Sequence, residues 1–311
     1  MSNTSEYLTP SFRYLSYLSS RGIYLTPSFR YLFFLVKMEY QCKTQSAGFQ
    51  RHKSCLVGTS ETTCATTYPK SFCEWLAGII DGDGSIQVSL SKQRKGYTSL
   101  EITMGLEDLP LLRYIQHMLG GSLFFMRSGA KSSRYRLHNQ LGMIKLIHCI
   151  NGHIRHSARL LQLHRVCQVL DIPVILPITL DAQSNWFAGF FDASGTIDIA
   201  MPIHDKHRLP QLSIRVINKL LQDVESYKVV FGGNIYFDGS QNGYYQWSVQ
   251  SRKDIIMMLD YFKSSTFRSH KSRRFFLIEE YYSLYEKKAF KPDSIHHKAG
   301  LAFLDKWNLI S

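Results

Sequence analysis

The order of apolar and polar residues predicts the same series of elements twice along the chain. Apolar spacing predicts a helix over Phe72–Asp81, and the alternation of Ile86, Val88 and Leu90 with polar residues predicts a strand over Ser85–Ser91. The other elements expected in this first series are strands at 97–104, 122–127 and 134–138, and helices at 108–119, 141–149 and 157–170.

A second series follows a stretch stiffened by two prolines. Its expected helices are at 185–192, 220–230, 253–263 and 267–285, and its expected strands are at 196–201, 211–216, 234–237 and 244–250. Gly120-Gly121 and Gly232-Gly233 end the corresponding helix in each series. Two αββαββα units predict an α+β protein with pseudo-two-fold symmetry, with the first helix of each unit at the seam and a saddle of two four-stranded sheets.

These patterns divide the chain into five segments: a leader at 1–70, a first repeat at 71–171, a linker at 172–182, a second repeat at 183–290 and a basic tail at 291–311. In the leader, Y-L-T-P-S-F-R-Y-L occurs at both 7–15 and 24–32, which indicates a recent duplication and not a folding unit. A mitochondrial transit peptide shares the composition of this segment. We expect a poorly ordered leader instead.

Charge narrows the class of partner. The 311 residues carry a formal charge of +13, and no Asp or Glu occurs between Asp108 and Asp171, where basic residues recur. This distribution favours an anionic partner, either a nucleic acid or an anionic membrane surface. The apolar runs are far shorter than the ~20 residues of a membrane span, so we expect no membrane insertion. Six scattered cysteines without a C-x-x-C pair indicate reduced thiols.

One motif organises both repeats. Trp75–Ser85 reads W-L-A-G-I-I-D-G-D-G-S, and Trp186–Thr196 reads W-F-A-G-F-F-D-A-S-G-T. The adjacent small residues in each copy, Ala77-Gly78 and Ala188-Gly189, allow a second backbone to approach closely. We expect the two helices to pack against each other and to bring their polar ends together.

The motif resembles that of the LAGLIDADG homing endonucleases of organellar group I introns, in the single-chain form with two copies. Leu76–Gly84 matches the family signature almost letter for letter, and Phe187–Gly195 matches it except that Ser194 stands where the family has its second catalytic acid. The resemblance covers residues 71–290. It implies a monomeric, intron-encoded enzyme that recognises a long double-stranded DNA target and hydrolyses phosphodiester bonds with Mg²⁺ or Mn²⁺, in a mitochondrion more than in a chloroplast.

The outward strand faces are candidates for base contacts, because a two-stranded ribbon fits the major groove. The polar residues of this parity are Gln87, Ser89, Ser99, Glu101, Arg134 and Arg136 in the first repeat and Asp198, Gln211, Ser213, Arg215, Tyr244 and Gln246 in the second. The alternate residues, expected beneath the helices, are Leu100, Ile102, Leu212, Ile214, Tyr245 and Trp247. Phosphate contacts are assigned to the loop residues Lys92, Arg94, Lys95, Lys131, Lys206 and Arg208.

The cutting centre is expected at the ends of the two motif helices. Asp83 is the predicted metal ligand, since Mg²⁺ prefers carboxylate oxygen, and the resemblance implies the carbonyls of Gly82 and Ala193 as minor ligands. Asp81 and Asp192 are expected to cap or order the turn. Ser194 lacks the charge of a carboxylate, so cleavage of both strands should be impaired or lost. Ser194→Asp should restore it if the rest of the centre is intact.

Basic residues at the start of the last helix of each repeat are further candidates. The resemblance implies that Arg155 and Arg268, with Lys271 as second choice, stabilise phosphate charge. Asn218 is a candidate for ordering water. Clustered histidines, His148, His153, His156 and His164, are interleaved with arginines and fit nucleic-acid contact better than a transition-metal site.

Two alternatives to an active nuclease remain open. The first is an RNA maturase that assists splicing of its own intron, a role known in this family that does not need two acids. The second is a DNA-binding remnant without a selected function. Ser194 favours these alternatives, whereas Asp83 and the polar strand faces favour the nuclease.

Overall fold

The computed structural model describes residues 68–89, 96–125, 129, 131–201, 209–240 and 243–310. The chain divides into two units, Met1–Cys64 and Ala65–Ser311, and only the second is described here. Nearly all of the predicted leader lies outside the described residues, as do five of the predicted phosphate contacts: Lys92, Arg94, Lys95, Lys206 and Arg208.

The first repeat contains four strands and four α-helices. In chain order these are α3 (Lys70–Asp83), β1 (Gly84–Val88), β2 (Thr98–Gly105), the 3-10 turn η2 (Leu106–Asp108), α4 (Leu109–Leu119), β3 (Ser122–Phe125), β4 (Ser132–Leu137), α5 (Gln140–Ile150) and α6 (Ser157–Leu170). Asn139 caps α5, because its side chain accepts a hydrogen bond from the Gly142 amide.

The second repeat has the same order and then continues. Its elements are α7 (Trp186–Ser194), β5 (Gly195–Ala200), β6 (Gln211–Asn218), η3 (Leu221–Asp223), α8 (Glu225–Phe231), β7 (Asn234–Asp238), β8 (Tyr244–Val249), α9 (Arg252–Ser264), α10 (Ser272–Phe275), α11 (Ile278–Glu286) and α12 (His297–Leu309).

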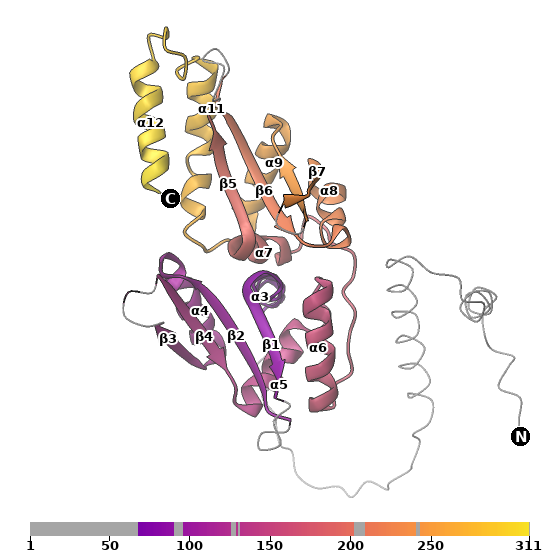
Figure 1. Cartoon of the computed structure of the whole chain (residues 1–311). Coiled ribbons are helices and arrows are strands. Elements are labelled where there is room, and N and C mark those ends of the chain that lie inside the picture. Colours follow the sequence, from indigo (N-terminus) through magenta and orange to yellow (C-terminus); the bar gives the residue numbers. More distant parts are fainter. Residues whose placement is uncertain are drawn as a thin grey trace, which may run out of the picture. The chain divides into compact units, whose positions relative to one another are not determined.

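Each repeat folds into one antiparallel four-stranded sheet. The strand orders are β1-β2-β4-β3 and β5-β6-β8-β7, so the two sheets have the same topology. Figure 1 shows the two sheets on opposite sides of the pair formed by α3 and α7. The predicted α+β class, with two four-stranded sheets and the motif helices at the seam, is confirmed.

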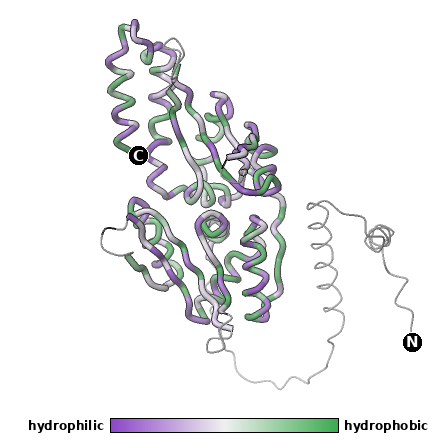
Figure 2. The backbone as a smooth tube through the Cα atoms, in the orientation of Figure 1, coloured by the Kyte–Doolittle hydropathy of each residue, from purple (hydrophilic) through white to green (hydrophobic). Residues whose placement is uncertain are grey.

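Strand register separates an inner from an outer face. Ile86 pairs with Leu100 and Ile102 pairs with Tyr135, and all four side chains are buried on the inner face. The corresponding inner residues of the second sheet include Leu212, Ile214 and Trp247, all fully buried, while Tyr245 is half-buried. Hydrophobic and hydrophilic residues alternate along these strands (Figure 2).

The seam is the contact between α3 and α7, and it requires glycine. A Cβ added to Gly78 would overlap the carbonyl oxygen of Trp186, and one added to Gly189 would overlap that of Trp75. The two backbones therefore lie closer than any side chain would permit. Leu76, Ala77, Phe187 and Ala188 are fully buried around this crossing.

One predicted helix differs from the structure, and the C-terminal tail contains a helix where its pattern is weakly helical, near Leu301–Trp307. The single helix predicted at 267–285 is wrong, since it is divided into α10 and α11. The backbone N–H groups of Arg268, Ser269 and His270 are bonded to carboxylates, and the helical turns begin only at Ser272. Part of the predicted C-terminal tail forms α12, which packs on α11 and buries Phe303 and Trp307. Among the described helices, none is both long and apolar enough to cross a membrane.

Candidate functional site

The C-terminal ends of α3 and α7 meet at one place. A Cβ added to Gly82 would overlap the Cβ of Ala193 and would lie 2.9 Å from Ser194 Oγ. Asp83 ends α3 here, and its carboxylate makes no hydrogen bond or ion pair with any residue that the structure describes. Burial raises the pKa of Asp83, while the nearby charges of Lys271 and Arg159 act to lower it.

Asp81 and Asp192 are buried two residues before these ends. Asp81 accepts hydrogen bonds from the amides of Arg155 and His156 and from Trp186 Nε1. Asp192 accepts the corresponding hydrogen bonds from the amides of Arg268 and Ser269 and from Trp75 Nε1. The bond from Trp186 to Asp81 and the bond from Trp75 to Asp192 are each 2.8 Å long. The prediction that they cap their own turn is therefore wrong. Each aspartate binds the segment that precedes a later helix of its own repeat, and it also binds the tryptophan of the other motif.

Burial dominates the electrostatics of these two carboxyl groups. It raises the pKa of Asp81 to about 8 and that of Asp192 to about 6, although in both cases several N–H donors act in the opposite direction. Every carboxylate oxygen of these two residues accepts at least one N–H donor. They are structural anchors of the seam.

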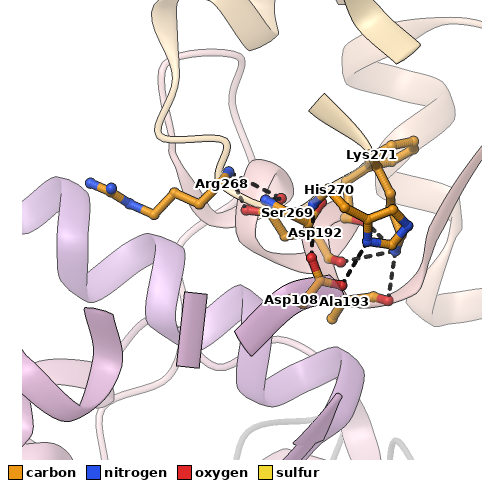
Figure 3. Close-up of polar contacts among 8 residues, drawn as sticks. Asp108, Asp192, Ala193, Arg268, Ser269, His270 and Lys271 are labelled. Carbon is orange, nitrogen blue, oxygen red and sulfur yellow. Dashed lines mark hydrogen bonds and ion pairs between the residues drawn. The ribbon is translucent and has the colours of Figure 1, made fainter. Parts of the chain in front are cut away.

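A second pair of aspartates crosses between the repeats. Asp108, at the end of η2, accepts from the amide of His270 at 2.8 Å and pairs with His270 Nδ1 at 2.9 Å, as Figure 3 shows. Asp223, at the end of η3, accepts from the amide and the hydroxyl of Ser157. Burial acts to raise the pKa of Asp108, but the hydrogen bonds from His270 outweigh it and hold this pKa below its ordinary value.

Basic side chains cap the C-terminal ends of both motif helices. Lys271 Nζ lies 2.8 Å from the carbonyl oxygens of Asp192 and Ala193 and 3.3 Å from that of Phe191 (Figure 3). Arg159 Nε donates to the carbonyl of Ile80 at 3.2 Å. Positive charge is favourable there, because unpaired carbonyls give a helix end partial negative charge.

Arg155 and Arg268 do not reach the helix ends, contrary to expectation. The guanidinium of Arg268 lies 3.8 Å from the ring centroid of Tyr114, and that of Arg155 lies 5.4 Å from the ring of Trp186. Figure 3 shows Arg268 pointing away from Lys271. The tryptophans lie eight residues before the helix ends, or about 12 Å along an α-helix. Of the three predicted basic residues, Lys271 alone is at the centre.

A cavity of about 580 Å³ opens beside Ser194. Its lining includes Gly82, Ala158, Arg159, Asn218, Lys219 and Tyr244. Asn218, the predicted water-ordering residue, lines it and contacts His156 Nδ1 at 3.3 Å through its amide nitrogen. The cavity is therefore polar and connected to the seam.

The outer sheet faces carry the predicted polar residues in register. Glu101 pairs with Arg136, Thr103 with Arg134, and Asp198 with Ser213 across neighbouring strands. The arginines are bonded within the sheet: Arg134 and Arg136 lie 3.5 and 3.2 Å from Glu101, and Arg215 lies 2.9 Å from Asp198.

Individual predicted contacts differ in access. Gln87, Lys131 and Gln211 are exposed, while Ser89, Tyr244 and Gln246 are half-buried. Ser213 is only 7% exposed and Ser99 only 4%, because longer neighbours on the same face cover these short side chains. Neither serine reaches the surface as predicted. Tyr244 donates a hydrogen bond to Asp238.

The residues at the helix ends fit one metal ion, at the end of α3 that carries Asp83. Within the described residues, no group of three His, Cys, Asp or Glu side chains is placed to hold a metal. A Mg²⁺ site commonly needs only one or two carboxylates, with waters and substrate phosphate completing the shell. Asp83 has unbonded carboxylate oxygens and fits this pattern. The carbonyl of Ala193 accepts one hydrogen bond from Lys271 and keeps a second lone pair, so its role as a minor ligand stays a prediction.

Sequence reasoning gave no role to several residues that shape the site. Asp108, Asp223 and His270 had no assigned role, and neither did the indole N–H groups of Trp75 and Trp186. One signal was available: Leu106-Glu107-Asp108 and Leu221-Gln222-Asp223 recur at the same place in the two repeats. Local sequence similarity between the repeats cannot show that each of these aspartates bonds to a residue of the other repeat.

Comparison with known proteins agrees with this arrangement. The probable intron-encoded endonuclease aI2 of Debaryomyces hansenii is 42% identical over 300 residues, covering 83% of this chain and 45% of that protein. The intron-encoded RNA maturase bI4 of Saccharomyces cerevisiae is 48% identical over 239 residues, covering 76% of this chain and 36% of that protein. The chain thus spans less than half the length of these two relatives.

The fold has solved counterparts. The LAGLIDADG homing endonuclease I-GzeII, solved in complex with its DNA target, superposes with a TM-score of 0.56 at 16% identity, over 74% of this chain and 96% of that one. A family model described as LAGLIDADG endonuclease matches residues 76–170 and again residues 187–282, which is one match for each repeat. The chain therefore belongs to the LAGLIDADG endonuclease family.

Proposed function

We propose that this protein binds a long double-stranded DNA target as a monomer and hydrolyses phosphodiester bonds in it, with cleavage impaired at Ser194. The observation that carries the proposal is the carboxylate of Asp83. It lies where the motif helices meet and has no bonding partner among the described residues, whereas Asp81 and Asp192 are saturated with donors. A half-buried acid with no hydrogen bond from the described part of the chain, between two polar sheets, suits a reacting centre.

The sheets supply the proposed DNA surface. Their outer faces present Gln87, Arg134, Arg136, Gln211, Arg215, Tyr244 and Gln246 from paired strands, with Lys131 in a connecting turn. The loop residues Lys92, Arg94, Lys95, Lys206 and Arg208 remain proposed phosphate contacts. If about eight phosphates are neutralised, log K should fall against log salt with a slope of about −7.

A divalent cation, Mg²⁺ or Mn²⁺, is the proposed cofactor. Asp83 and the carbonyl of Gly82 would hold it, and it would supply charge neutralisation and an activated water. Lys271 stabilises negative charge at the same place through its ammonium, and burial of the surrounding acids keeps bulk water from screening that charge.

The test is a binding and cleavage assay on an intron-lacking exon-junction duplex. We expect a shifted complex, salt-sensitive affinity and slow metal-dependent cleavage that Asp83→Asn abolishes without weakening binding. A flat salt response, or cleavage that survives Asp83→Asn, would contradict the proposal.

An RNA maturase acting on its own intron is the second candidate. It is favoured by the name of the relative that is 48% identical and by the loss of an acid at Ser194. Acceleration of splicing by the purified protein, undiminished by Asp83→Asn, would support this role. The intron-encoded relatives also support a mitochondrial location for this protein, in preference to a chloroplast.

A further inference from the structure

The seam contains two pseudo-symmetric half-sites whose residues correspond one to one. Asp192 holds the amides of Arg268 and Ser269, and Asp81 holds those of Arg155 and His156. The next residues then correspond: His270 to Ser157, and Lys271 to Ala158. An independent contact agrees, because Asp108 bonds to His270 and Asp223 bonds to Ser157.

The half-sites are chemically unequal. We call Asp83, Asp108, His270 and Lys271 the Asp83 half, and Ser194, Asp223, Ser157 and Ala158 the Ser194 half. The first has an unbonded carboxylate, an imidazole fixed by a carboxylate and an ammonium on three carbonyl oxygens. The second has a hydroxyl, a hydroxyl and a methyl group at the three corresponding positions.

The cavity lies in the Ser194 half, where the side chains are smaller. Ser194 and Ala158 both line the space of about 580 Å³, together with Gly82 and Asp223. The positions that correspond to Ser194, Ala158 and Ser157 carry the larger side chains of Asp83, Lys271 and His270. Smaller side chains at these positions leave the Ser194 half more open, and the loss on this side is more than the loss of one acid.

We propose that this chain cuts only one strand of its duplex, at the Asp83 half, and that the Ser194 half is inactive because it has no acid at the position of Ser194 and no lysine at the position of Ala158. This rests on the proposed function. In the step, a P–O bond to a water oxygen forms and the P–O bond to a sugar oxygen breaks. The water loses one proton, and the leaving sugar oxygen gains one. Lys271 and His270 are positioning residues, because neither is shown to touch substrate.

Two cationic residues, Lys219 and Arg159, line the cavity, and of these Arg159 reaches a motif helix end and challenges this assignment. It lines the cavity, and its Nε donates to Ile80, so a positive charge does lie in the Ser194 half. Its guanidinium is planar and contacts one carbonyl oxygen, whereas the compact ammonium of Lys271 contacts three. Arginine and lysine are not equivalent in such a setting. The experiment must therefore separate the missing lysine from the missing acid.

The experiment uses the full chain and an exon-junction duplex with a different label on each strand. The wild-type protein should shorten one strand only, the same strand in every molecule, at a metal concentration that leaves binding saturated. Ser194→Asp alone should leave second-strand cutting at least about 10-fold slower than Ser194→Asp combined with Ala158→Lys. Equal cutting of both strands by the wild type would overturn the proposal, as would full rescue by Ser194→Asp alone.

Two further measurements keep the outcome interpretable. A Mn²⁺ titration of the protein–DNA complex should find one more bound ion in the double variant than in the wild type. An unchanged number would also overturn the proposal. Absence of any duplex binding would refute the proposed function itself. Binding without wild-type cutting, together with two-strand cutting by the double variant, would refute only the claim that the Asp83 half acts alone.

Discussion

His156 is the histidine at the centre of the seam, and its contacts require the neutral ring. It is 5% exposed, its Nε2 lies 2.6 Å from Tyr227 Oη, and its Nδ1 faces the amide nitrogen of Asn218. An amide nitrogen can only donate, so Nδ1 accepts and Nε2–H donates to Tyr227. Burial lowers the pKa of His156 to about 3, and Arg159 and Arg155 add to the effect.

This histidine should make the protein sensitive to mild acid. A base whose pKa is lower in the folded state than in the unfolded state stabilises the fold above about pH 6.5 and loses that contribution as pH falls. The contribution of His156 to the free energy of unfolding should drop by up to ~1.4 kcal/mol per pH unit below 6.5, read as the difference between the wild type and a variant without the imidazole. Urea unfolding between pH 7 and 5 measures this.

His156→Gln is the control for the acid response. The raised pKa values of Asp81 and Asp192 act in the opposite direction in both proteins, so the difference between wild type and variant isolates the imidazole. The variant should be less stable at pH 7 and should lose less stability on acidification. Parallel curves would show that His156 is not buried as a neutral ring.

The reciprocal tryptophan–aspartate bonds should be measurable as stability. Trp75→Phe keeps an aromatic ring but removes the N–H that donates to the buried Asp192 carboxylate at 2.8 Å. Hydrogen bonds to charged groups are worth about 1.5–3 kcal/mol, so we expect a loss of that order in urea unfolding at pH 8. At this pH, above the Asp192 pKa of about 6, the carboxylate is ionised.

Trp307→Phe is a matched control for this pair. Trp307 is 2% exposed, and its Nε1 has no hydrogen-bond partner among the described residues. The same substitution there removes ring volume but no bond. A loss as large as that of Trp75→Phe would mean that ring packing, and not the hydrogen bond, accounts for both effects.

The motif helices depend on glycine at their crossing. Gly78→Ala and Gly189→Ala would each place a Cβ against the backbone of the opposing helix, which cannot move aside as a side chain could. Overpacking in a core commonly costs about 1–3 kcal/mol, and more when the neighbour is rigid. We expect each variant to lose at least about 3 kcal/mol or to fail to fold, measured by thermal unfolding.

Gly239→Ala provides the comparison for these two substitutions. A Cβ there would meet only one ring atom of Phe237, at 4.0 Å. It should change the free energy of unfolding by less than ~0.5 kcal/mol. If Gly78→Ala were equally harmless, the two helices would not cross at the distance described.

Considered as a whole, the molecule neutralises part of its own proposed DNA surface. Glu101 lies between Arg134 and Arg136 on the outer face of the first sheet and pairs with both. Glu101→Gln removes that negative charge and releases both arginines for phosphate. We expect tighter duplex binding, by several-fold at low salt, and a steeper salt dependence in titrations followed by fluorescence anisotropy.

Glu279→Gln makes the same charge change away from the sheets. Glu279 is exposed on α11 and pairs with Lys263 on α9. If the outer sheet faces bind DNA, this variant should shift affinity much less than Glu101→Gln. Equal shifts would mean that only net charge matters, and would argue against the sheets as the interface.

Most of the fold was predictable because its patterns are local. Strand alternation and the paired glycines placed all eight strands within a few residues of their observed bounds. The helix predicted at 267–285 begins only at Ser272, and the residues before it donate their amides to carboxylates on distant elements, Asp192 and Asp108. Such long-range bonds leave no periodic signal.

The site was predictable only where the motif itself carries the chemistry. Asp83, Ser194 and the seam glycines follow from the doubled motif. Arg155 and Arg268 were misassigned, because their amides lie near the centre while their guanidinium groups turn to Trp186 and Tyr114. The sequence position of each arginine predicts where its backbone lies, but the neighbouring aromatic rings determine the direction of its guanidinium group.

The sequence by itself determined the family, the doubled architecture, the crossing of the two motif helices and the missing second acid, since each depends on residue type at fixed local spacing. Only the tertiary structure decided that the charge of Lys271 lies near Asp83 while Ala158 lines the cavity beside Ser194. That pairing arises where loops and helix ends from both repeats meet. The asymmetry of the motif thereby becomes an asymmetry of two complete half-sites.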